Sequence, residues 1–577
     1  MTTLESLAAA MFPAITHTPE DYEAMYPPRA LKEGARVTRI APSPTGYLHL
    51  GVFFTAMVNR LTASASDGVF YFRLEDTDKK REVAGGAEDI LTGLNAYGLT
   101  IDEGFVAPGE VRGAYGPYQQ SERVAIYQCY VKSLVEKGLA YPCFCTEEQR
   151  QAVREQQEEA KQRTGYYGAY APCRSLSPEE ALERVRAGAS YVVRLRSPGS
   201  EENRVKFDDM IKGTIEMPEN DEDLVLLKSD GVPTYHFAHA VDDHLMRTTH
   251  VIRGDEWIAS TPIHLQLFRL LGFKPPKYAH VSPIMKEENG GKRKLSKRKD
   301  PEAAMHFYAE QGYPADSVLE YLLTIANSDF EDWRRRNPGE PRSRFPFNLK
   351  KMSVSGALFD MDKLDDVSKN VIAFMDAPTV AGYIRRWAAQ YDPEFSALLE
   401  SDPVYAEGIF AIDRGGSKPR KDITKWSDAK EYAAYFYDSL YQRAFDLPEN
   451  IAPADAAAIL EAYAAVYDPT LDKQAWFDAV KAMCPSLGFC PEVKEYKKNP
   501  EGYKGHAGDV STVLRIAVTG VFMCAVCLAQ YYWNFLGVEG GHKEVRTSVF
   551  TLFVIFQLFN AFCCRELGNA SIFPNLL

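Results

Sequence analysis

The first third of the chain alternates short runs of β-branched and aromatic residues with stretches that look helical. Residues 37–40 and 69–74 are two such runs, and residues 49–64 between them have helical spacing of apolar positions. From Val318 onward the pattern is mostly helical, with breaks at 334–346 and 414–422. The pattern therefore predicts an α/β part followed by an all-helical part.

Two other segments are predicted to be helical. Residues 146–163 form a highly charged stretch without β-forming runs. Residues 1–15 suit a short amphipathic helix and not an export signal, because Glu5 stands where a signal peptide is basic.

Two uncharged stretches lie near the end of the chain. Residues 516–538 contain 23 residues without a charge and residues 547–564 contain 18. Each length is near the roughly 20 residues that cross a bilayer as a helix. Asn534, Gln557 and Asn560 instead suit two buried helices of a soluble bundle. Membrane insertion, burial, and a segment foreign to the rest of the protein are the three alternatives.

The composition is ordinary for a soluble globular protein. At roughly 150 residues per domain, 577 residues predict about four domains. Hydrophobic residues at 45% and charged residues at 25% exclude a disordered chain and a polytopic membrane protein. The net charge of −13 gives no global basic field, although a local basic track suffices to bind nucleic acid. Ten cysteines are too few for a disulfide scaffold.

A Pro- and Gly-rich loop connects the first predicted strand to the first helix, at residues 39–51. Backbone N–H groups at a helix start, with the helix dipole behind them, suit a phosphate. Gly51 has no side chain to hold a nucleotide away from the backbone. His49 can donate a hydrogen bond to phosphate oxygens as charge develops at phosphorus. Alone, the loop is equally consistent with a plain strand–turn–helix connection.

A basic run follows some 240 residues later, where six of the eight residues 292–299 are Lys or Arg. Alone, such a run is a solvated face or a nucleic-acid patch. Together with the first loop, it indicates a mobile loop whose Lys294 and Lys297 neutralise a triphosphate.

These residues resemble the signatures of a known family. Residues 49–52 resemble the HIGH motif of class I aminoacyl-tRNA synthetases, with Val52 in place of the second histidine, and residues 294–298 resemble the KMSKS motif. Five other segments resemble bacterial glutamyl-tRNA synthetases in particular: 41–46, 73–78, 231–236, 241–246 and 251–257. The whole resemblance covers about residues 30–520. Ser43 and Thr45 favour glutamate over glutamine.

The resemblance implies an α/β fold with a Rossmann-like class I catalytic domain, an insertion and an all-helical anticodon-binding domain. The expected parts are an N-terminal helical extension (1–34), the first half of the nucleotide-binding fold (35–130), an acceptor-binding insertion with the cysteines (131–222), the second half with the basic loop (223–300), a connecting helical subdomain (301–370), the anticodon-binding domain (371–520) and an apolar hairpin tail of two transmembrane helices foreign to the family (521–577).

The resemblance also implies the activity. The expected enzyme uses ATP with Mg²⁺ to convert L-glutamate to glutamyl-adenylate, and transfers the glutamyl group to the 3′-terminal adenosine of tRNA-Glu in protein synthesis. No protein nucleophile is needed, so the protein positions reactants and stabilises charge. We expect a cytoplasmic monomer, with tRNA-Gln as a second substrate left open and membrane association only through the tail. The alternatives are a non-catalytic tRNA-binding homologue and a membrane-anchored fusion protein.

Site residues follow from the same resemblance. The planar fork of arginine binds a carboxylate bidentately, and an acid is needed for the ammonium group of glutamate. The residues expected to bind glutamate are Arg39, Ala41, Ser43, Glu75, Tyr235, His239 and Arg253. The catalytic residues are His49, Gly51, Lys294 and Lys297, and ATP is expected to contact these four together with Glu256 and Ser296.

Three cysteines in the insertion suit a structural zinc knuckle, because Cys143, Cys145 and Cys173 lie within 31 residues. No histidine lies between Cys145 and Cys173, so the fourth ligand is open. Tyr167 or Tyr170 offers a phenolate, which is a poor zinc ligand. Bound zinc and reduced cysteines are therefore the two alternatives.

The C-terminal part carries two further expectations. Basic residues at 414–425 are expected to contact RNA phosphates, and the neighbouring Trp426 is expected to stack on a base. A solvated connection between helices is the alternative. After Gly520 the resemblance changes, and residues 556–560 and 565–569 resemble the last membrane hairpin of P-type calcium-transporting ATPases. That piece lacks the phosphorylated Asp and the ion site of a pump. A chimeric gene and a real fusion both explain the join.

Overall fold

The structure, a computed structural model, forms two compact units. It describes residues 2–44, 46–78, 83–296, 298–412, 414–415, 419–441, 451–468, 471 and 473–514. The first unit comprises Met1–Asp376 with Asp413–Trp426, and the second comprises Ala377–Ile412 with Ser427–Leu577. The strands β1 to β13 all belong to the first unit, and the elements described in the second unit are helical.

The first sheet of the α/β part is parallel apart from one edge strand. Its strands are β1 (Val37–Ile40), β2 (Val69–Phe72), β3 (Glu103–Ala107) and the antiparallel β4 (Glu110–Arg112). The crossover helices are α3 (Leu50–Ser64) and α4 (Gly86–Ala96). The strands predicted at 37–40 and 69–74 and the helix predicted at 49–64 are confirmed within two residues.

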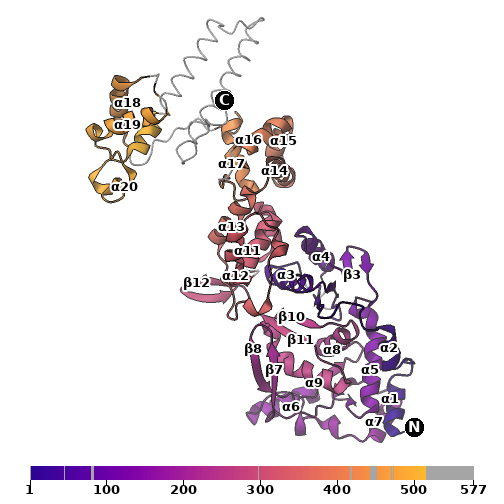
Figure 1. The fold of residues 1–577 in the computed structure, drawn as a ribbon. Coiled ribbons are helices and arrows are strands. Elements are labelled where there is room, and N and C mark those ends of the chain that lie inside the picture. The colour runs from indigo at the N-terminus through magenta and orange to yellow at the C-terminus, as the bar shows by residue number, and fades with distance from the viewer. Residues whose placement is uncertain are drawn as a thin grey trace. The chain divides into compact units, whose positions relative to one another are not determined.

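The second sheet repeats this arrangement in the later half of the fold. Its strands, in spatial order, are β10 (His250–Gly254), β11 (Lys277–Val281), β7 (Arg204–Asp209) and the antiparallel β8 (Gly213–Pro218). Helices α8 (Tyr235–Leu245) and α9 (Thr261–Leu271) lie beside β10 and β11 (Figure 1).

The two sheets meet between β1 and β10, where the Thr249 N–H donates to the Val37 carbonyl at 3.0 Å. Strand order runs outward from this junction in both directions. Open parallel sheets bind their ligands beyond the carboxyl ends of the strands at such a reversal. The topology therefore places the site beyond Ile40 and Gly254.

The insertion between the two halves has its own small antiparallel sheet of β5 (Ala140–Cys143), β6 (Val192–Leu195) and β9 (Val225–Leu227). Its helices are α6 (Glu147–Glu159) and α7 (Pro178–Arg186). The charged helix predicted at 146–163 is confirmed. It begins after Thr146 because the Thr146 and Gln149 side chains cap each other's backbone N–H groups.

The chain begins with two short helices, α1 (Thr3–Met11) and α2 (Pro19–Met25). The buried residues Leu7, Ala8 and Met11 share one apolar cluster with residues of α5 (Val124–Glu136). The amphipathic helix expected at the N-terminus is thus confirmed, and its apolar face is part of the core.

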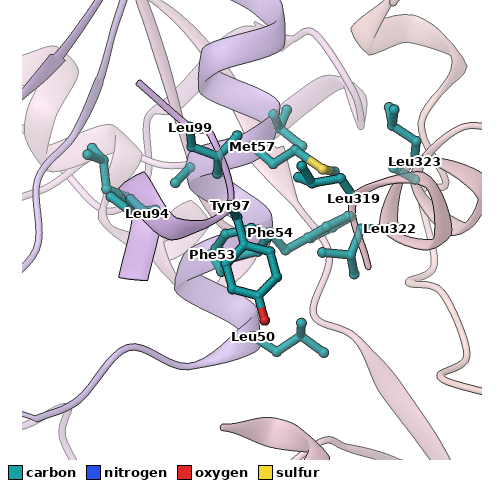
Figure 2. Close-up of a cluster of buried hydrophobic side chains, with 14 of the residues drawn as sticks. Leu50, Phe53, Phe54, Met57, Leu94, Tyr97, Leu99, Leu319, Leu322 and Leu323 are labelled. Carbon is teal, nitrogen blue, oxygen red and sulfur yellow. The ribbon is translucent and has the colours of Figure 1, made fainter. Parts of the chain in front are cut away.

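The main core of the first unit joins the catalytic sheet to the helices after it. Leu50, Phe53, Phe54 and Met57 of α3 pack against Leu94, Tyr97 and Leu99, and on the other side against α11 (Ala315–Ala326) (Figure 2). The ring centroids of Phe53 and Tyr97 are 4.9 Å apart, edge to face. Burial of this many large side chains fixes the start of α3, since each contributes about 1.5–3 kcal/mol.

The connecting helices complete the first unit: α10 (Met305–Gln311), α11, α12 (Ser328–Arg336) and α13 (Met361–Ala373). Trp426 belongs to their core. Its backbone N–H donates to the Gly312 carbonyl at 2.8 Å, and its side chain is only 4% exposed. The prediction that Trp426 stacks on an RNA base is therefore wrong, because the ring is covered by protein.

The second unit consists of helices, as the sequence pattern predicts. They are α14 (Ala377–Tyr391), α15 (Pro393–Ser401), α16 (Pro403–Ala411), α17 (Ala429–Ala433), α18 (Pro453–Val466), α19 (Lys473–Leu487) and α20 (Val493–Tyr496). Ile459, Val480, Phe489 and Val510 are buried in one small cluster formed by the described residues after 450.

The part of the chain that the structure describes contains no helix long and apolar enough to cross a membrane. The two stretches that the sequence assigns to transmembrane helices, 516–538 and 547–564, lie outside the described residues.

Candidate active site

A large cavity of about 1380 Å³ opens beyond the carboxyl ends of β1, β2, β10 and β11. This is the position that the reversal of strand order requires. Ten of the residues predicted for the site line it: Arg39, Ala41, Ser43, His49, Gly51, Glu75, Tyr235, Arg253, Glu256 and Lys294. The two sequence motifs, about 240 residues apart, thus face the same space.

His49 and Gly51 form the start of α3 at the cavity wall. The Gly51 N–H donates to His49 Nδ1 at 3.1 Å, so His49 caps the helix with its own ring. Because Nδ1 accepts, the proton of the neutral ring lies on Nε2. A Cβ on residue 51 would lie 3.1 Å from His49 Cε1, so glycine lets the ring lie against the backbone. The arrangement offers an imidazole donor and a helix start to an anionic ligand.

Arg39 lies in β1, next to the last residue of the strand, and lines the cavity. Its guanidinium is bound by Asp243. Its Nε donates to both Asp243 carboxylate oxygens at 3.3 Å, and only 5% of the residue is exposed. Arg73 Nη1 donates to the same carboxylate at 2.7 Å. Burial opposes the charge of Asp243, but Arg39 and Arg73 outweigh it and hold the pKa of Asp243 well below its usual range. The carboxylate is therefore a fixed anchor for two guanidinium groups.

Glu75 lies three residues beyond the end of β2, and Arg73 Nη2 donates to its carboxylate at 2.9 Å. Burial raises the pKa of Glu75, against the opposing pull of Arg73. Glu75 is 6% exposed and lines the cavity. A cationic group entering the cavity would favour its ionised form, so Glu75 can serve as an ammonium partner.

Arg253 reaches the cavity from β10 and has different partners. Its Nε donates to His280 at 3.0 Å, its Nη1 to His264 at 3.0 Å, and its Nη2 to the Thr261 hydroxyl at 3.1 Å. None of these acceptors is a carboxylate. A buried guanidinium with neutral acceptors retains its attraction for an anionic ligand.

Tyr235 lines the cavity, and its ring lies 4.3 Å from that of Trp257. His239 does not line the cavity: its ring is fully buried, 6.0 Å from the Tyr235 ring and stacked on it, and its Nδ1 lies 3.0 Å from Asp243. Burial lowers the pKa of His239 to about 4. His239 lies outside the cavity lining because it is one helical turn after Tyr235, deeper between α8 and α9. His239 is thus placed to support Tyr235 and Asp243.

The basic loop begins as a hairpin of β12 (Met285–Glu288) and β13 (Gly291–Lys294). Lys294 is exposed at the end of β13 and lines the cavity. Ser296 does not line it; its N–H donates to Asp300 at 2.8 Å. Lys297 lies outside the described residues. Asp300 also accepts from Arg293 at 2.6 and 2.7 Å, so this one carboxylate ties the two ends of the loop together.

Arg73 and Asp243 are the residues to which the sequence assigned no role, although both lie inside resembling segments. Arg73 follows four apolar strand residues, and Asp243 lies in an apolar helix with Asp242 before it. A charged residue on an otherwise buried element needs a partner, because an unpaired buried charge is costly. That signal indicates from the sequence that each residue has a charged partner, although it does not identify the partner.

The three cysteines of the insertion come together as predicted. The sulfur atoms of Cys143, Cys145 and Cys173 all lie within 4.8 Å of one another. The phenol oxygen of Tyr166 lies 3.3 Å from both Cys143 Sγ and Cys145 Sγ. Hydrogen bonds, first that from Cys173, lower the pKa of the Cys143 thiol to about 4. Three sulfurs this close together, one of them with a lowered pKa, suit a soft divalent cation such as zinc.

The tyrosine of this cluster differs from the expectation. The sequence offered Tyr167 or Tyr170 as the fourth zinc ligand, but these two rings pack against each other edge to face, with centroids 5.8 Å apart. Tyr166 takes the place because it is buried among the cysteines, with the Arg194 guanidinium 3.9 Å from its ring centroid. Three nearly adjacent tyrosines cannot be told apart by spacing alone.

The fold and the cavity with its two motifs are those of the class I aminoacyl-tRNA synthetases. The family model "tRNA synthetases class I (E and Q), catalytic domain" matches residues 36–366. Glutamate–tRNA ligase of Clostridium perfringens (strain 13 / Type A) is 50% identical over 519 residues, which cover 89% of this chain and 95% of the relative. The chain belongs to the glutamate–tRNA ligase family, and it is an enzyme of the aminoacyl-tRNA synthetase class.

Two further comparisons agree with this assignment. Glutamate–tRNA ligase of Clostridium beijerinckii is 49% identical over 520 residues, covering 89% of this chain and 94% of the relative. The crystal structure of a glutamate tRNA ligase from Elizabethkingia meningosepticum, in complex with its amino acid, is similar with a TM-score of 0.60 and 27% identity. The match covers 79% of this chain and 91% of the chain in the crystal structure.

A second family model, "Cation transporting ATPase, C-terminus", matches residues 482–577. Both resemblances predicted from the sequence are thereby confirmed. The second match begins before Gly520 and includes α20.

Proposed function

We propose that the chain joins L-glutamate to the 3′-terminal adenosine of tRNA-Glu in the cavity of the first unit, at the expense of ATP. The observation that carries the proposal is the convergence of Arg39, Arg253 and Glu75 with the start of α3 on one cavity. Two guanidinium groups and one carboxylate match the charges of glutamate, whose side chain and backbone offer carboxylates and an ammonium group.

The ATP phosphates bind at the start of α3. His49 Nε2–H and the N-terminal backbone N–H groups of α3 meet the phosphates, and Gly51 lets the nucleotide approach. Lys294, Lys297 and Ser296 of the basic loop act on the same phosphates, and Glu256 at the cavity wall contacts the nucleotide. ATP enters with Mg²⁺, as the synthetase class implies.

Glutamate binds between the arginines and Glu75. Arg39 and Arg253 bind its side-chain carboxylate, Glu75 accepts from its ammonium group, and the loop residues Ala41 and Ser43 border it. Tyr235 adds a hydrogen bond, with His239 supporting its ring from behind.

The reaction then needs only that the protein positions the reactants and stabilises the charge on the phosphates. An oxygen of the glutamate α-carboxylate attacks the α-phosphorus of ATP, forming a P–O bond as the bond to pyrophosphate breaks. His49 and the loop lysines stabilise the charge that moves onto the phosphates. The ribose 2′-hydroxyl of the terminal adenosine next attacks the acyl carbon, and AMP leaves. The protein lowers both barriers by holding the reacting atoms in line.

Glutamate-dependent ATP–pyrophosphate exchange, measured with and without tRNA, tests the proposal. Exchange by the full chain and its loss in His49→Ala support it. The alternative, a non-catalytic tRNA-binding homologue, would bind tRNA-Glu without any exchange. Charging assays with purified tRNA-Glu and tRNA-Gln decide whether the second tRNA is also a substrate.

The remaining parts keep the roles that the sequence suggests. The insertion (131–222) receives the acceptor end of the tRNA, and the helical part from 371 to 520 binds the anticodon. The catalytic domain spans 35–130 and 223–300, between the extension (1–34) and the connecting subdomain (301–370). We expect a monomer in the cytoplasm, which sedimentation and fractionation would test.

The cysteine cluster is proposed to bind Zn²⁺. Cys143, Cys145 and Cys173 would hold the ion with the Tyr166 oxygen beside them, and the ion would tie β5 to the segment around residue 173. The role is structural, because none of these residues lines the cavity. Metal analysis of the purified full chain tests it, and a zinc content near zero contradicts it.

The tail from 521 to 577 is proposed to be foreign to the synthetase, with two apolar helices that would anchor the enzyme if the fusion is genuine. The match of 482–577 to the C-terminus of cation-transporting ATPases supports this. Expression of residues 1–520 beside the full chain tests it. A shorter form that is insoluble while the full chain dissolves without detergent would mean that the tail is part of the soluble core.

A further inference from the structure

The partners of the cavity-lining Arg253 include two buried histidines and no carboxylate among the described contacts. Arg253 Nε donates to His280 Nε2 at 3.0 Å, and Arg253 Nη1 bonds His264 Nδ1 at 3.0 Å. Both rings are fully buried. Nη2 of Arg253 is occupied by the Thr261 hydroxyl at 3.1 Å and the Trp257 carbonyl at 3.3 Å. The guanidinium is thus fixed on three sides by uncharged acceptors.

The hydrogen bonds also fix the proton positions on both rings. His264 Nδ1 accepts from Arg253, so its proton is on Nε2, which donates to His236 Nδ1 at 2.9 Å. His280 Nε2 accepts from Arg253, so its proton is on Nδ1, which donates to Asp209 at 2.6 Å. Each ring is a neutral acceptor toward Arg253 and a donor on its far side. Burial lowers the pKa of both histidines, which favours this neutral form.

The other buried arginines around the site have carboxylate partners. Arg39 and Arg73 share Asp243, and Arg123 donates to Asp242 at 2.7 Å. Among the described contacts, Arg253 has no carboxylate within ion-pair distance. A carboxylate partner of its own would offset part of the charge of Arg253, whereas a neutral imidazole holds the guanidinium and leaves its charge in place.

We propose that His264 and His280 are positioning residues that keep Arg253 oriented and uncompensated, so that it binds the side-chain carboxylate of the amino-acid substrate. The inference rests on the proposed role of Arg253 in glutamate binding. Neither histidine touches the substrate, since neither lines the cavity.

The test compares variants that keep or remove the acceptor atom. In His264→Asn the side-chain oxygen occupies the place of Nδ1, whereas His264→Leu has no acceptor. His280→Gln and His280→Leu form the corresponding pair for Nε2. His250→Leu is the matched control, because His250 is a buried histidine of the same strand as Arg253 and bonds Thr249 instead. Glutamate-dependent ATP–pyrophosphate exchange is measured for the full chain with tRNA present.

The expected result is a split between KM and kcat. The Leu variants should raise the KM for glutamate about ten- to a hundredfold, as expected for a lost hydrogen bond to a charged group, with the KM for ATP within threefold. The Asn and Gln variants should restore the glutamate KM to within threefold of the parent. Equal losses in the Leu and acceptor-retaining variants, or an unchanged KM in all of them, would overturn the proposal.

Folding and function are separated by two controls. If the Leu variants are insoluble, His264→Ala and His280→Ala serve as the acceptor-free forms: a glutamate KM at least tenfold above that of the Asn and Gln variants supports the proposal, and an equal KM contradicts it. If the parent protein shows no glutamate-dependent exchange, it is the proposed function that fails. If the parent is active and His250→Leu changes the KM as much as His264→Leu, the effect is general to buried histidines and the positioning role is refuted.

Discussion

Replacing Arg39 by alanine should separate glutamate binding from ATP binding. Arg39 lines the cavity with its guanidinium anchored on Asp243. Under the proposed function, Arg39→Ala removes one of the two cations that face a bound glutamate carboxylate. The fold should survive the change, because Asp243 keeps Arg73 at 2.7 Å and His239 Nδ1 at 3.0 Å. The loss therefore falls on the substrate.

The magnitude follows from leaving a buried carboxylate with one cation instead of two. Truncating one partner of a buried, hydrogen-bonded charge pair costs about 2–5 kcal/mol. At about 1.4 kcal/mol per factor of ten, this raises the KM for glutamate roughly thirtyfold to several thousandfold. The KM for ATP should stay within about threefold, since the residues proposed to bind the phosphates lie at the start of α3 and on the basic loop.

The assay is ATP–pyrophosphate exchange with glutamate varied at saturating ATP and tRNA. Arg29→Ala is the control, because Arg29 is a mostly buried arginine that bonds Glu103 at 2.6 Å and does not line the cavity. It should lower the melting temperature without changing the glutamate KM. A glutamate KM of Arg39→Ala within a factor of two of the parent would mean that Arg39 is structural and that the carboxylate binds elsewhere.

Three further changes test other parts of the molecule. Lys297→Ala should lower the rate of adenylate formation far more than it weakens glutamate binding, because its ammonium acts as charge moves onto pyrophosphate; equal losses in rate and binding would contradict the loop assignment. Cys173→Ala should abolish zinc binding in metal analysis and lower the melting temperature while leaving the glutamate KM unchanged; a full zinc content in the variant would refute the ligand set. Asp300→Asn should loosen the basic loop and lower the exchange rate about tenfold. The pKa of Asp300 lies below its ordinary 3.8, chiefly because of the hydrogen bond from Arg293. The ionised Asp300 therefore stabilises the fold at pH values above about 4. The difference in melting temperature between the parent and Asp300→Asn should therefore be full at pH 7 and shrink as pH falls below about 4, and a constant difference would show that the pair does not stabilise the fold.

The sequence predicted the elements that carry strong periodic patterns. The strands at 37–40 and 69–74, the helix after His49 and the charged helix after Thr146 all lie where the apolar spacing and the caps place them. These features are local, so neighbouring residues determine them. The ten predicted site residues that line one cavity were assigned from the resemblance of their motifs to the synthetase family.

Features that depend on depth and packing were not predictable in the same way. His239 and Trp426 have ordinary positions in the sequence, but both side chains are covered in the fold. Tyr166 is buried among the cysteines with the Arg194 guanidinium over its ring, a tertiary contact that spacing does not encode. The acceptors of Arg253 come from α9 and β11, which no local pattern links.

The packing of α3 against α11 sets the smallest fragment of this enzyme that can fold. All residues that we propose to bind ATP and glutamate precede Asp300, so a catalytic fragment cut there would contain every one of them. Such a fragment would nevertheless leave Leu50, Phe54 and Met57 without the apolar cover of Leu319, Leu322 and Leu323 (Figure 2). Exposed apolar side chains of that size favour aggregation. A minimal active enzyme for screening or crystallisation must therefore extend through α11, well beyond its last catalytic residue.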